Sequence, residues 1–377
     1  MRTLVDENTG REVRQLTDLP DGCAVGYFRV PRNMPGGLIL ARGAHGQGDL
    51  LAINPDDGGV QPIRRHLGTM LRLRESDGRA WFWREDPKRE SWAVELPEGS
   101  AESVGRIAPD APGRPTDITC DGRCVILLDS HEEPGDYPRT APTTLDVDEI
   151  WRWWHRPRNG AIWVYDMESE SFIKVVEMKG LCPGHVDTSP TDPGLLKYAN
   201  DGLNIFHQRI WTVRVDGSNQ RKIRAQEQGE WVCHEFWWPD GRYIAYKYMD
   251  RRNDTTIHEL PWCEYAPVAL HLGIANLDGT ECYRSEPLNC FHSHIFVSPD
   301  ERWVCGEGTM DHSMVYAAPF SMSNPRVDFV PVATIHTPYL PIAAQEANAG
   351  FSADSRWLVY NDTIDGNKQV CAVEVDI

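Results

Sequence analysis

The sequence predicts an all-β protein, a single seven-bladed β-propeller of four-stranded antiparallel blades that occupies residues 1–377. Three observations lead to this prediction. A turn that carries an aspartate, followed by an alternating strand, recurs along the chain. Apolar residues at helical spacing are hard to find. The N-terminal residues have the pattern of a strand hairpin that can close the last blade.

Six copies of the turn account for six blades. The copies are SDGRAWFWRED at Asp77, CDGRCVILLDS at Asp121, SPTDPGLLKYAND at Asp192 (the weakest), WPDGRYIAYKYMD at Asp240, SPDERWVCGEG at Asp300 and SADSRWLVYND at Asp354. Successive aspartates are 44, 71, 48, 60 and 54 residues apart, which is irregular but the size of a blade. Asp-Gly turns supply the positive φ that a tight hairpin needs, and the alternation after the turn buries one face of each strand.

Further strands complete each blade. They are expected in AIWVYDMESESFIKVVEM, RIWTVRVDGSNQRKI, LHLGIANLDGTECYRS and QVCAVEVDI, which alternate and contain polar turns. The segment from AVGYFRVP to DLLAIN supplies one more blade. Because QVCAVEVDI ends the chain one strand short, TLVDENTGREVRQLTD is expected to close the last blade. A segment rich in Pro, Asp and Trp at about 132–160 breaks the rhythm and predicts an insertion over one face. Its WRWWHRPR run can stack on a sugar or pack on the propeller rim, and the second reading is slightly favoured.

Composition limits the classes of function. The net charge of -18 argues against nucleic acid or an anionic membrane as partner, because both need a basic surface, but it allows a small anionic ligand in a locally basic pocket. The first residues have no apolar signal region and no later stretch is long enough to span a membrane, so a cytoplasmic location is expected. Ten cysteines without a CxxC pair favour reduced thiols, and CDGRC at 120–124 reads as strand ends rather than metal ligands.

The motif CHEFWWPDG at 233–241 resembles the oligogalacturonate lyases, cytoplasmic manganese-dependent seven-bladed propellers that cleave short pectin fragments by β-elimination. The resemblance extends from about Cys182 to the C-terminus and, more loosely, over the N-terminal third. In that family an arginine that precedes a tryptophan in a strand, a DGSN turn and a basic stretch come before the motif, and here RIWTVRVDGSNQRKI does so. By position the resemblance implies that Arg209 binds the substrate carboxylate and that His234 is the Brønsted base.

The same resemblance implies a metal site. FHSHIFVSPD supplies His294, six residues before Asp300, as a ligand. Where the family has a glutamine followed by HPHP, this chain has AAQEANAGF, which offers Gln345, Glu346 and Asn348. This mixed nitrogen and oxygen set suits Mn²⁺, or alternatively Ca²⁺.

Substrate-binding residues are expected as well. The family's HEG element reads NDG at 200–202, which places Asn200 among them, together with His185 and His292. Each histidine can instead be an ordinary inner-strand residue.

The chemistry requires two devices. Breaking a 4-linked uronoside by β-elimination removes the proton on the carbon next to the carboxylate, so a cation must neutralise that carboxylate and a base of near-neutral pKa must reach the proton. Histidine suits the second role and arginine the first. Each assignment has an alternative. An isolated histidine among apolar residues can be a packed core residue, and an arginine can form an ion pair between blades. The proposed metal loop can be a polar loop without an ion.

The sequence therefore predicts two alternative functions. The first is a lyase that acts on an acidic, uronic-acid-containing oligosaccharide, with Arg209, His234 and His294 expected to point from successive blades toward one pocket. The second is a non-catalytic propeller that binds a carbohydrate or a protein, which the altered metal motif favours. The sequence leaves the uronate, its linkage and the oligomeric state open.

Overall fold

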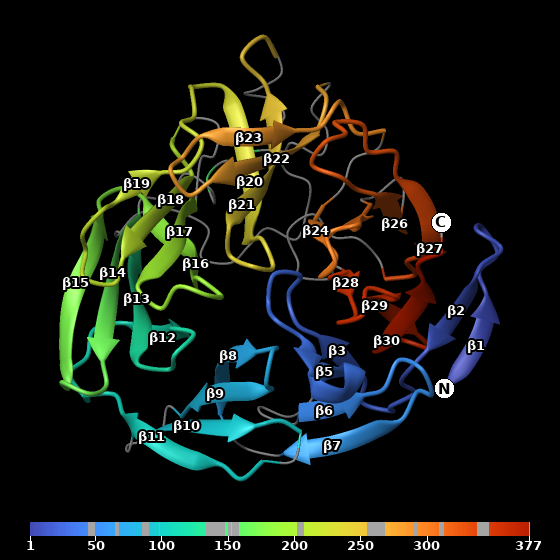
Figure 1. The fold of residues 1–377 in the computed structure, drawn as a ribbon, viewed down its shortest axis with the longest axis horizontal. Coiled ribbons are helices and arrows are strands. Elements are labelled where there is room, and N and C mark those ends of the chain that lie inside the picture. Colours follow the sequence, from blue (N-terminus) through green and yellow to red (C-terminus); the bar gives the residue numbers. More distant parts are fainter. Residues whose placement is uncertain are drawn as a thin grey trace. The chain divides into compact units, whose positions relative to one another are not determined.

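The computed structural model describes residues 1–43, 50–64, 68–84, 90–97, 99–132, 148–149, 152, 158–201, 207–254, 268–289, 293–308, 313–337 and 347–376. These residues form seven antiparallel sheets that follow one another along the chain (Figure 1). The sheets confirm the predicted blades of a seven-bladed β-propeller. Contacts between Cα atoms divide the chain into a terminal unit, within Met1–Arg106, Leu288–Tyr339 and Gln345–Ile377, and a central unit, Ile107–Pro287. The single domain over residues 1–377 stays a prediction.

The terminal unit contains four of the sheets and a short 3-10 helix, η1 (Pro35–Gly37). Its first two sheets consist of β3 (Cys23–Val25), β4 (Asn33–Met34), β5 (Leu38–Gly43), β6 (Leu50–Ile53) and β7 (Val60–Arg64), then β8 (Thr69–Arg74), β9 (Arg79–Trp83), β10 (Glu90–Glu95) and β11 (Glu102–Arg106). The other two consist of β24 (Ile295–Val297), β25 (Trp303–Glu307), β26 (Met314–Pro319) and β27 (Val330–Thr334), then β28 (Gly350–Phe351), β29 (Trp357–Ile364), β30 (Asn367–Glu374), β2 (Glu12–Gln15) and β1 (Arg2–Val5).

The last of these sheets joins the two ends of the chain. Strand β2 pairs with β30, with Val13 opposite Val373, and β1 pairs with β2 on the outer edge. The predicted closure by the N-terminus is therefore confirmed. The hairpin contributes two strands, so this sheet has five strands in the order β1-β2-β30-β29-β28.

The central unit contains the remaining three sheets, each of four strands. They consist of β12 (Arg114–Ile118), β13 (Cys124–Glu132), β14 (Arg158–Asp166) and β15 (Ser171–Met178), then β16 (Cys182–Thr188), β17 (Leu195–Asp201), β18 (Ile210–Arg214) and β19 (Arg221–Lys222), then β20 (Glu230–Trp237), β21 (Tyr243–Asp250), β22 (His271–Asn276) and β23 (Glu281–Arg284). The expected insertion falls between β13 and β14, and its WRWWHRPR run lies almost entirely outside the described residues.

The repeated aspartates explain why the sheets recur. In every copy Oδ1 accepts a hydrogen bond of 2.8 to 3.1 Å from the backbone N–H two residues later, which closes the turn between the first and second strands of a sheet. The six aspartates are Asp77, Asp121, Asp192, Asp240, Asp300 and Asp354. The repeated sequence pattern therefore corresponds to the same local hydrogen bond in six turns.

Apolar residues of neighbouring sheets pack into the cores. In the central unit, Ile126 and Ile162 of one sheet lie in one cluster with Leu196 and Tyr198 of the next, and all four are buried. Burying a side chain of this size stabilises a fold by about 1.5–3 kcal/mol. Within this unit the alternation of the strands therefore places side chains between successive sheets and holds them together.

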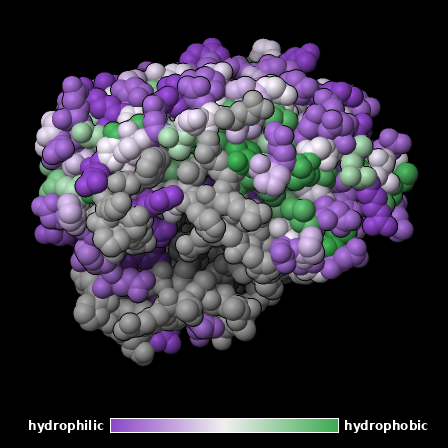
Figure 2. All heavy atoms as spheres, turned by 90° about the horizontal axis from the view of Figure 1, so that it is seen from below, coloured by the Kyte–Doolittle hydropathy of each residue, from purple (hydrophilic) through white to green (hydrophobic). Residues whose placement is uncertain are grey.

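One face of the described surface is mostly polar (Figure 2). Figure 2 shows one face on which the coloured residues are largely hydrophilic and the hydrophobic ones lie in smaller groups. No helix among the described residues is long and apolar enough to cross a membrane. Free thiols are seen at Cys23, Cys120, Cys124, Cys233, Cys282, Cys305 and Cys371. Cys124 begins β13, as expected for a strand-end cysteine, and burial raises the pKa of its thiol to about 11.

Candidate active site

His185 in β16 and His234 in β20 occupy matching irregularities of successive sheets. The pairing of β16 with β17 shifts register between Gly184 and Asp187, and that of β20 with β21 shifts between Cys233 and Phe236. The φ angles of the two histidines are 45° and 51°, a left-handed conformation that costs a residue with a side chain about 1–3 kcal/mol. Both side chains are half-buried. Bulges and strained residues of this kind gather at functional sites, because they turn a side chain out of the regular strand.

Glu235, the residue after His234 in β20, contacts His185 in β16 and Arg209, which directly precedes β18. Its Oε2 accepts a hydrogen bond of 2.7 Å from Nε of Arg209, and its Oε1 lies 2.9 Å from Nδ1 of His185. Glu235 is fully buried and Arg209 is 1% exposed, whereas the His185 side chain is 20% exposed. Arg209 Nη2 also lies 3.3 Å from His185 Nδ1. The structure therefore brings together Arg209, His185 and the strand that carries His234.

The charges around Glu235 keep it ionised. Burial alone would raise the pKa of its carboxyl group, but Arg209, His185 and Lys197 outweigh that effect and hold the pKa well below the ordinary value. Lys197 is fully buried, donates to the carbonyl oxygen of His185 at 3.3 Å and pairs with Asp187. The cluster thus contains the carboxylates of Glu235 and Asp187 and the basic side chains of Arg209 and Lys197 in addition to the imidazole.

Asn200 lies on the same sheet face as Arg209. Ala199 is opposite Ile210 in the β17–β18 pair, so Asn200 is opposite Arg209, and its N–H donates to the Arg209 carbonyl oxygen at 2.7 Å. The Asn200 side chain is buried, and no donor among the described residues reaches its Oδ1. A buried carbonyl oxygen without a donor costs about 1–3 kcal/mol, so a ligand hydroxyl at this position would be favoured.

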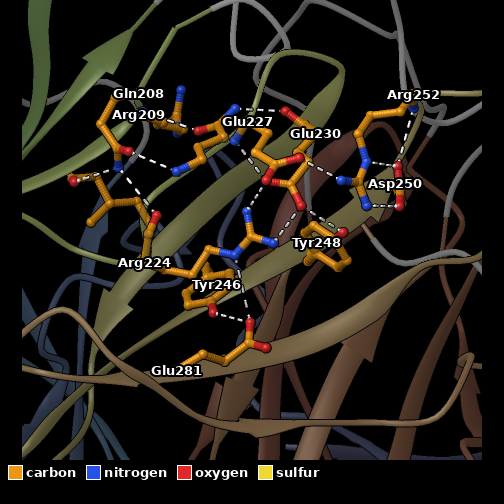
Figure 3. Close-up of polar contacts among 12 residues, drawn as sticks. Gln208, Arg209, Arg224, Glu227, Glu230, Tyr246, Tyr248, Asp250, Arg252 and Glu281 are labelled. Carbon is orange, nitrogen blue, oxygen red and sulfur yellow. Dashed lines mark hydrogen bonds and ion pairs between the residues drawn. The ribbon is translucent and has the colours of Figure 1, made fainter.

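A second polar network ties the start of β18 to the start of β20 (Figure 3). Gln226 Nε2 donates to the Glu230 carbonyl oxygen at 2.6 Å, and its Oε1 accepts from the backbone N–H of Arg209 at 3.1 Å. The Glu230 side chain is held by a two-pronged pair with Arg224, at 2.5 and 2.7 Å, and by the Tyr248 hydroxyl at 3.0 Å. This network fixes Arg209 relative to the strand that carries His234.

The terminal unit holds His294 in a closed environment. Nδ1 of His294 is bonded to Glu307, Nε2 lies 3.0 Å from the Tyr27 hydroxyl, and the ring stacks on Phe28 with centroids 4.2 Å apart. His294 is 2% exposed. Both ring nitrogens are therefore used within the protein.

Asn348 contacts Phe28, the residue whose ring stacks on His294. Its Oδ1 accepts the Phe28 N–H at 3.2 Å, and its carbonyl oxygen accepts from Nη1 of buried Arg32 at 2.8 Å. Among the described residues, no cluster of histidine, cysteine and acidic side chains suits a metal ion. As arranged here, His294 does not fit a divalent ion, because both of its ring nitrogens are already engaged. The ligand roles of Gln345 and Glu346, and the substrate role of His292, concern residues outside the described part of the chain. The expected meeting of His294 with Arg209 and His234 in one pocket stays a prediction.

A sequence model described as Oligogalacturonate lyase matches residues 163–271, which contain His185, Arg209, His234 and Glu235. This segment is similar to the oligogalacturonate lyases. The resemblance inferred from CHEFWWPDG is thereby confirmed over that segment. The oligogalacturonide lyase of Pectobacterium atrosepticum is 32% identical over 106 residues, which is 26% of this chain and 27% of that protein. The oligogalacturonate lyase of Dickeya dadantii is 30% identical over 107 residues and is covered to the same extent. The alignments span about a quarter of these relatives.

Two solved structures share the fold over nearly the whole chain. One is described as oligogalacturonate lyase in complex with manganese, with a TM-score of 0.73, 18% identity and coverage of 99% of this chain and 96% of that one. The other, an oligogalacturonate lyase from Vibrio parahaemolyticus, has a TM-score of 0.74 and 17% identity, with coverage of 99% and 96%. At these identities the likeness establishes the propeller fold alone.

Sequence reasoning missed the carboxylates that hold the histidines. Glu235 and Glu307 are buried charges inside otherwise apolar strands, in CHEFWW and WVCGEG, and so is Lys197 in LLKYA. Charged residues are almost never fully buried unless they are paired, so each was a signal of a hidden partner. The partner itself could not be read from the sequence.

Proposed function

We propose that this protein is a carbon-oxygen lyase that cleaves a uronic-acid-containing oligosaccharide by β-elimination. The observation that carries the proposal is the link from Arg209 to Glu235, next to His234, inside the segment similar to oligogalacturonate lyases. The names of the relatives support an acidic oligosaccharide as substrate. A cytoplasmic location remains part of this proposal.

The reaction assigns a role to each residue. His234 removes the proton from the carbon next to the carboxylate, for which the ordinary histidine pKa of about 6.5 is suitable. Arg209 supplies the positive charge that stabilises the carboxylate as negative charge develops on it. Asn200 and His185 bind the sugar, and the Asn200 Oδ1 is the acceptor for a hydroxyl group.

Arg209 is more deeply buried than a residue that meets substrate directly. Its 1% exposure means that contact with a carboxylate requires neighbouring groups to move, as closing segments do in many enzymes. The charge is nevertheless fixed in place, because Glu235 holds Nε and Gln226 holds the backbone N–H. A preorganised charge stabilises a transition state without reorganisation at the moment of reaction.

The resemblance to the oligogalacturonate lyases also implies a divalent metal ion. The relative that is described with manganese supports it, but the hydrogen bonds of His294 and Asn348 do not. Mn²⁺, or Ca²⁺, would therefore have to be held by Gln345 and Glu346 together with a rearranged His294.

A second candidate function is a non-catalytic propeller that binds an acidic carbohydrate. The closed His294 cluster favours it, since a family member that had lost its metal would show such a site. Binding without turnover would distinguish it from the lyase.

The deciding experiment measures the ultraviolet absorbance of the unsaturated uronate product. Purified protein is incubated with oligogalacturonides and with other uronic-acid oligosaccharides, each with Mn²⁺, with chelator and with neither. A rise with any member of the panel that is lost in His234→Gln supports the lyase. If absorbance stays constant across the panel while calorimetry detects binding, the non-catalytic function replaces it.

A further inference from the structure

The proposed elimination needs two proton transfers, and only one has been assigned. The base takes the C5 proton, the electrons of that bond form the C4=C5 double bond, and the C4–O4 bond breaks with its electron pair moving to O4. The leaving sugar departs as an alcohol only if O4 gains a proton. A positioned acid at this step accelerates such reactions by about 10²–10⁴-fold. No residue has yet been given this role.

His185 is held as an acid–base histidine is held. Its Nδ1 lies 2.9 Å from Glu235 Oε1, and the ionised carboxylate can only accept a hydrogen bond, so Nδ1–H is the donor. Proton exchange with a substrate then takes place at Nε2. A buried carboxylate that fixes the tautomer and supports the imidazolium is the arrangement found in catalytic triads. The 20% exposure of His185, against none for Glu235, places the outer part of this pair toward solvent.

The surrounding charges permit the protonated form. Glu235 and Arg209 face the ring, and Lys197, which pairs with Asp187, contacts the His185 carbonyl oxygen. These two carboxylates and two cations compensate one another. A proton on His185 therefore adds a single positive charge, next to a carboxylate that stabilises it.

The position of His185 matches that of the proposed base. Each of the two histidines is the left-handed residue of a bulge in the first strand of its sheet, and the two sheets are successive. Glu235 bonds to His185 and directly follows His234 in β20, so one residue connects the two. Arg209 Nη2 also lies 3.3 Å from His185 Nδ1; since both are donors, this contact places the proposed carboxylate-binding arginine beside the ring without a hydrogen bond to it.

We propose that His185, oriented by Glu235, is the general acid that protonates the leaving O4 atom. The inference rests on the proposed function and extends it. Its Nε2–H bond breaks as the O4–H bond forms, and the neutral histidine is reprotonated by solvent before the next turnover. The base keeps the C5 proton until product leaves, so atoms and electrons balance without an oxidant or a metal.

Two substrates separate the acid from the base. In trigalacturonate the leaving group is a sugar oxygen, which must gain a proton to become a hydroxyl group. A galacturonide with fluoride at C4 instead releases fluoride, an anion that needs no proton. For His185→Gln we expect a loss of about 10²–10⁴-fold in kcat on trigalacturonate and at most a few-fold loss on the fluoride. His234→Gln should lose both activities. Fluoride release is followed with an ion electrode, and the unsaturated product by its absorbance.

A control variant and a pH profile of the wild type test this interpretation. His336→Gln removes an exposed histidine of the terminal unit whose Nδ1 is held 2.7 Å from Asp362, and both activities should remain. Wild-type protein supplies a readout that needs no variant: the fall of kcat at high pH, as His185 loses its proton, should be seen with trigalacturonate and be absent with the fluoride.

The possible outcomes are distinct. Equal losses on both substrates in a folded His185→Gln variant, or no loss on either, would overturn the role of acid. Identical high-pH limbs for the two substrates in the wild type would overturn it too, even if the variant did not fold. A wild-type protein that converts neither substrate nor any other uronic-acid oligosaccharide of the panel would instead refute the proposed lyase.

Discussion

The Glu235 carboxylate accepts a 2.7 Å hydrogen bond from Nε of Arg209, and neither side chain is more than 1% exposed. A pair buried this deeply costs desolvation energy that a hydrophobic pair would not, so it contributes more to placement than to stability. It connects the residue before β18 to a residue in the middle of β20.

Glu235→Gln is expected to lower stability in a pH-dependent way. The pKa of Glu235 in the folded state lies well below its ordinary value of 4.5, so its ionised form contributes fully above about pH 4.5. The contribution is lost as pH falls through the lower, folded-state value. Urea unfolding from pH 7 to pH 3 should therefore show a gap of a few kcal/mol between wild type and variant that narrows in acid. A gap that stays constant with pH would contradict the assignment of charge to Glu235.

Arg209→Lys should lose most activity while keeping the charge. A lysine ammonium has no planar fork, so it cannot bond Glu235 through Nε and also direct a second nitrogen toward His185. We expect kcat/KM on the substrate identified above to fall by about 10²-fold or more. Arg251→Lys is the matched control, because it changes another fully buried arginine of the same unit, one that pairs with Asp254, a residue outside the site. If it lost as much activity, the effect would reflect the fold and not the site.

Gln226→Leu should disturb the site without contacting it. The change removes the hydrogen bonds to the Arg209 N–H and the Glu230 carbonyl oxygen, each worth about 0.5–1.5 kcal/mol. Stability should fall by about 1–3 kcal/mol, and kcat should fall about 10-fold because Arg209 is no longer fixed relative to β20. Gln226→Glu retains an acceptor for the Arg209 N–H but sets a second oxygen against the Glu230 carbonyl oxygen, so it should keep more activity than Gln226→Leu while losing at least as much stability. Full activity in Gln226→Leu would show that this link does not position Arg209.

Mn²⁺ should not stabilise the wild-type protein. The Tyr27 hydroxyl already engages Nε2 of His294, and the Phe28 N–H engages Oδ1 of Asn348. A ligand that bound the native state at 100 times its Kd would add about 2.7 kcal/mol and raise Tm. We expect the Tm to be the same with about 1 mM Mn²⁺, with chelator and with neither, because no specific ion binds the native state. A rise in wild type that disappears in His294→Gln would show instead that the Tyr27 contact gives way to the ion.

Asp240→Ala tests the repeated turn. The substitution removes the acceptor of the Arg242 N–H at 2.9 Å, and the variant should lose about 1 kcal/mol of unfolding free energy. Asp240→Asn keeps a side-chain oxygen at the same place and should lose less than half of that. Calorimetry of both variants checks the difference. Equal losses would mean that the carboxylate acts through its charge and not through the turn.

The sequence by itself determined the architecture. The spacing of the six turn aspartates and the alternation after each one specify hairpins locally, because a tight turn and a two-residue period act over a few neighbouring residues. The N-terminal hairpin was predictable because the last repeat lacked a strand. The motif around His234 also gave the family resemblance.

Only the tertiary structure decided how the site is built. Glu235 and His185 are 50 residues apart, and Tyr27 and His294 are 267 residues apart, so no local pattern relates them. Hydrogen bonds of this kind depend on which strands pack together and on bulges that turn single side chains, and neither is encoded at one position. The sequence named Arg209, His234 and His294, but their burial and partners come from the packing of whole sheets.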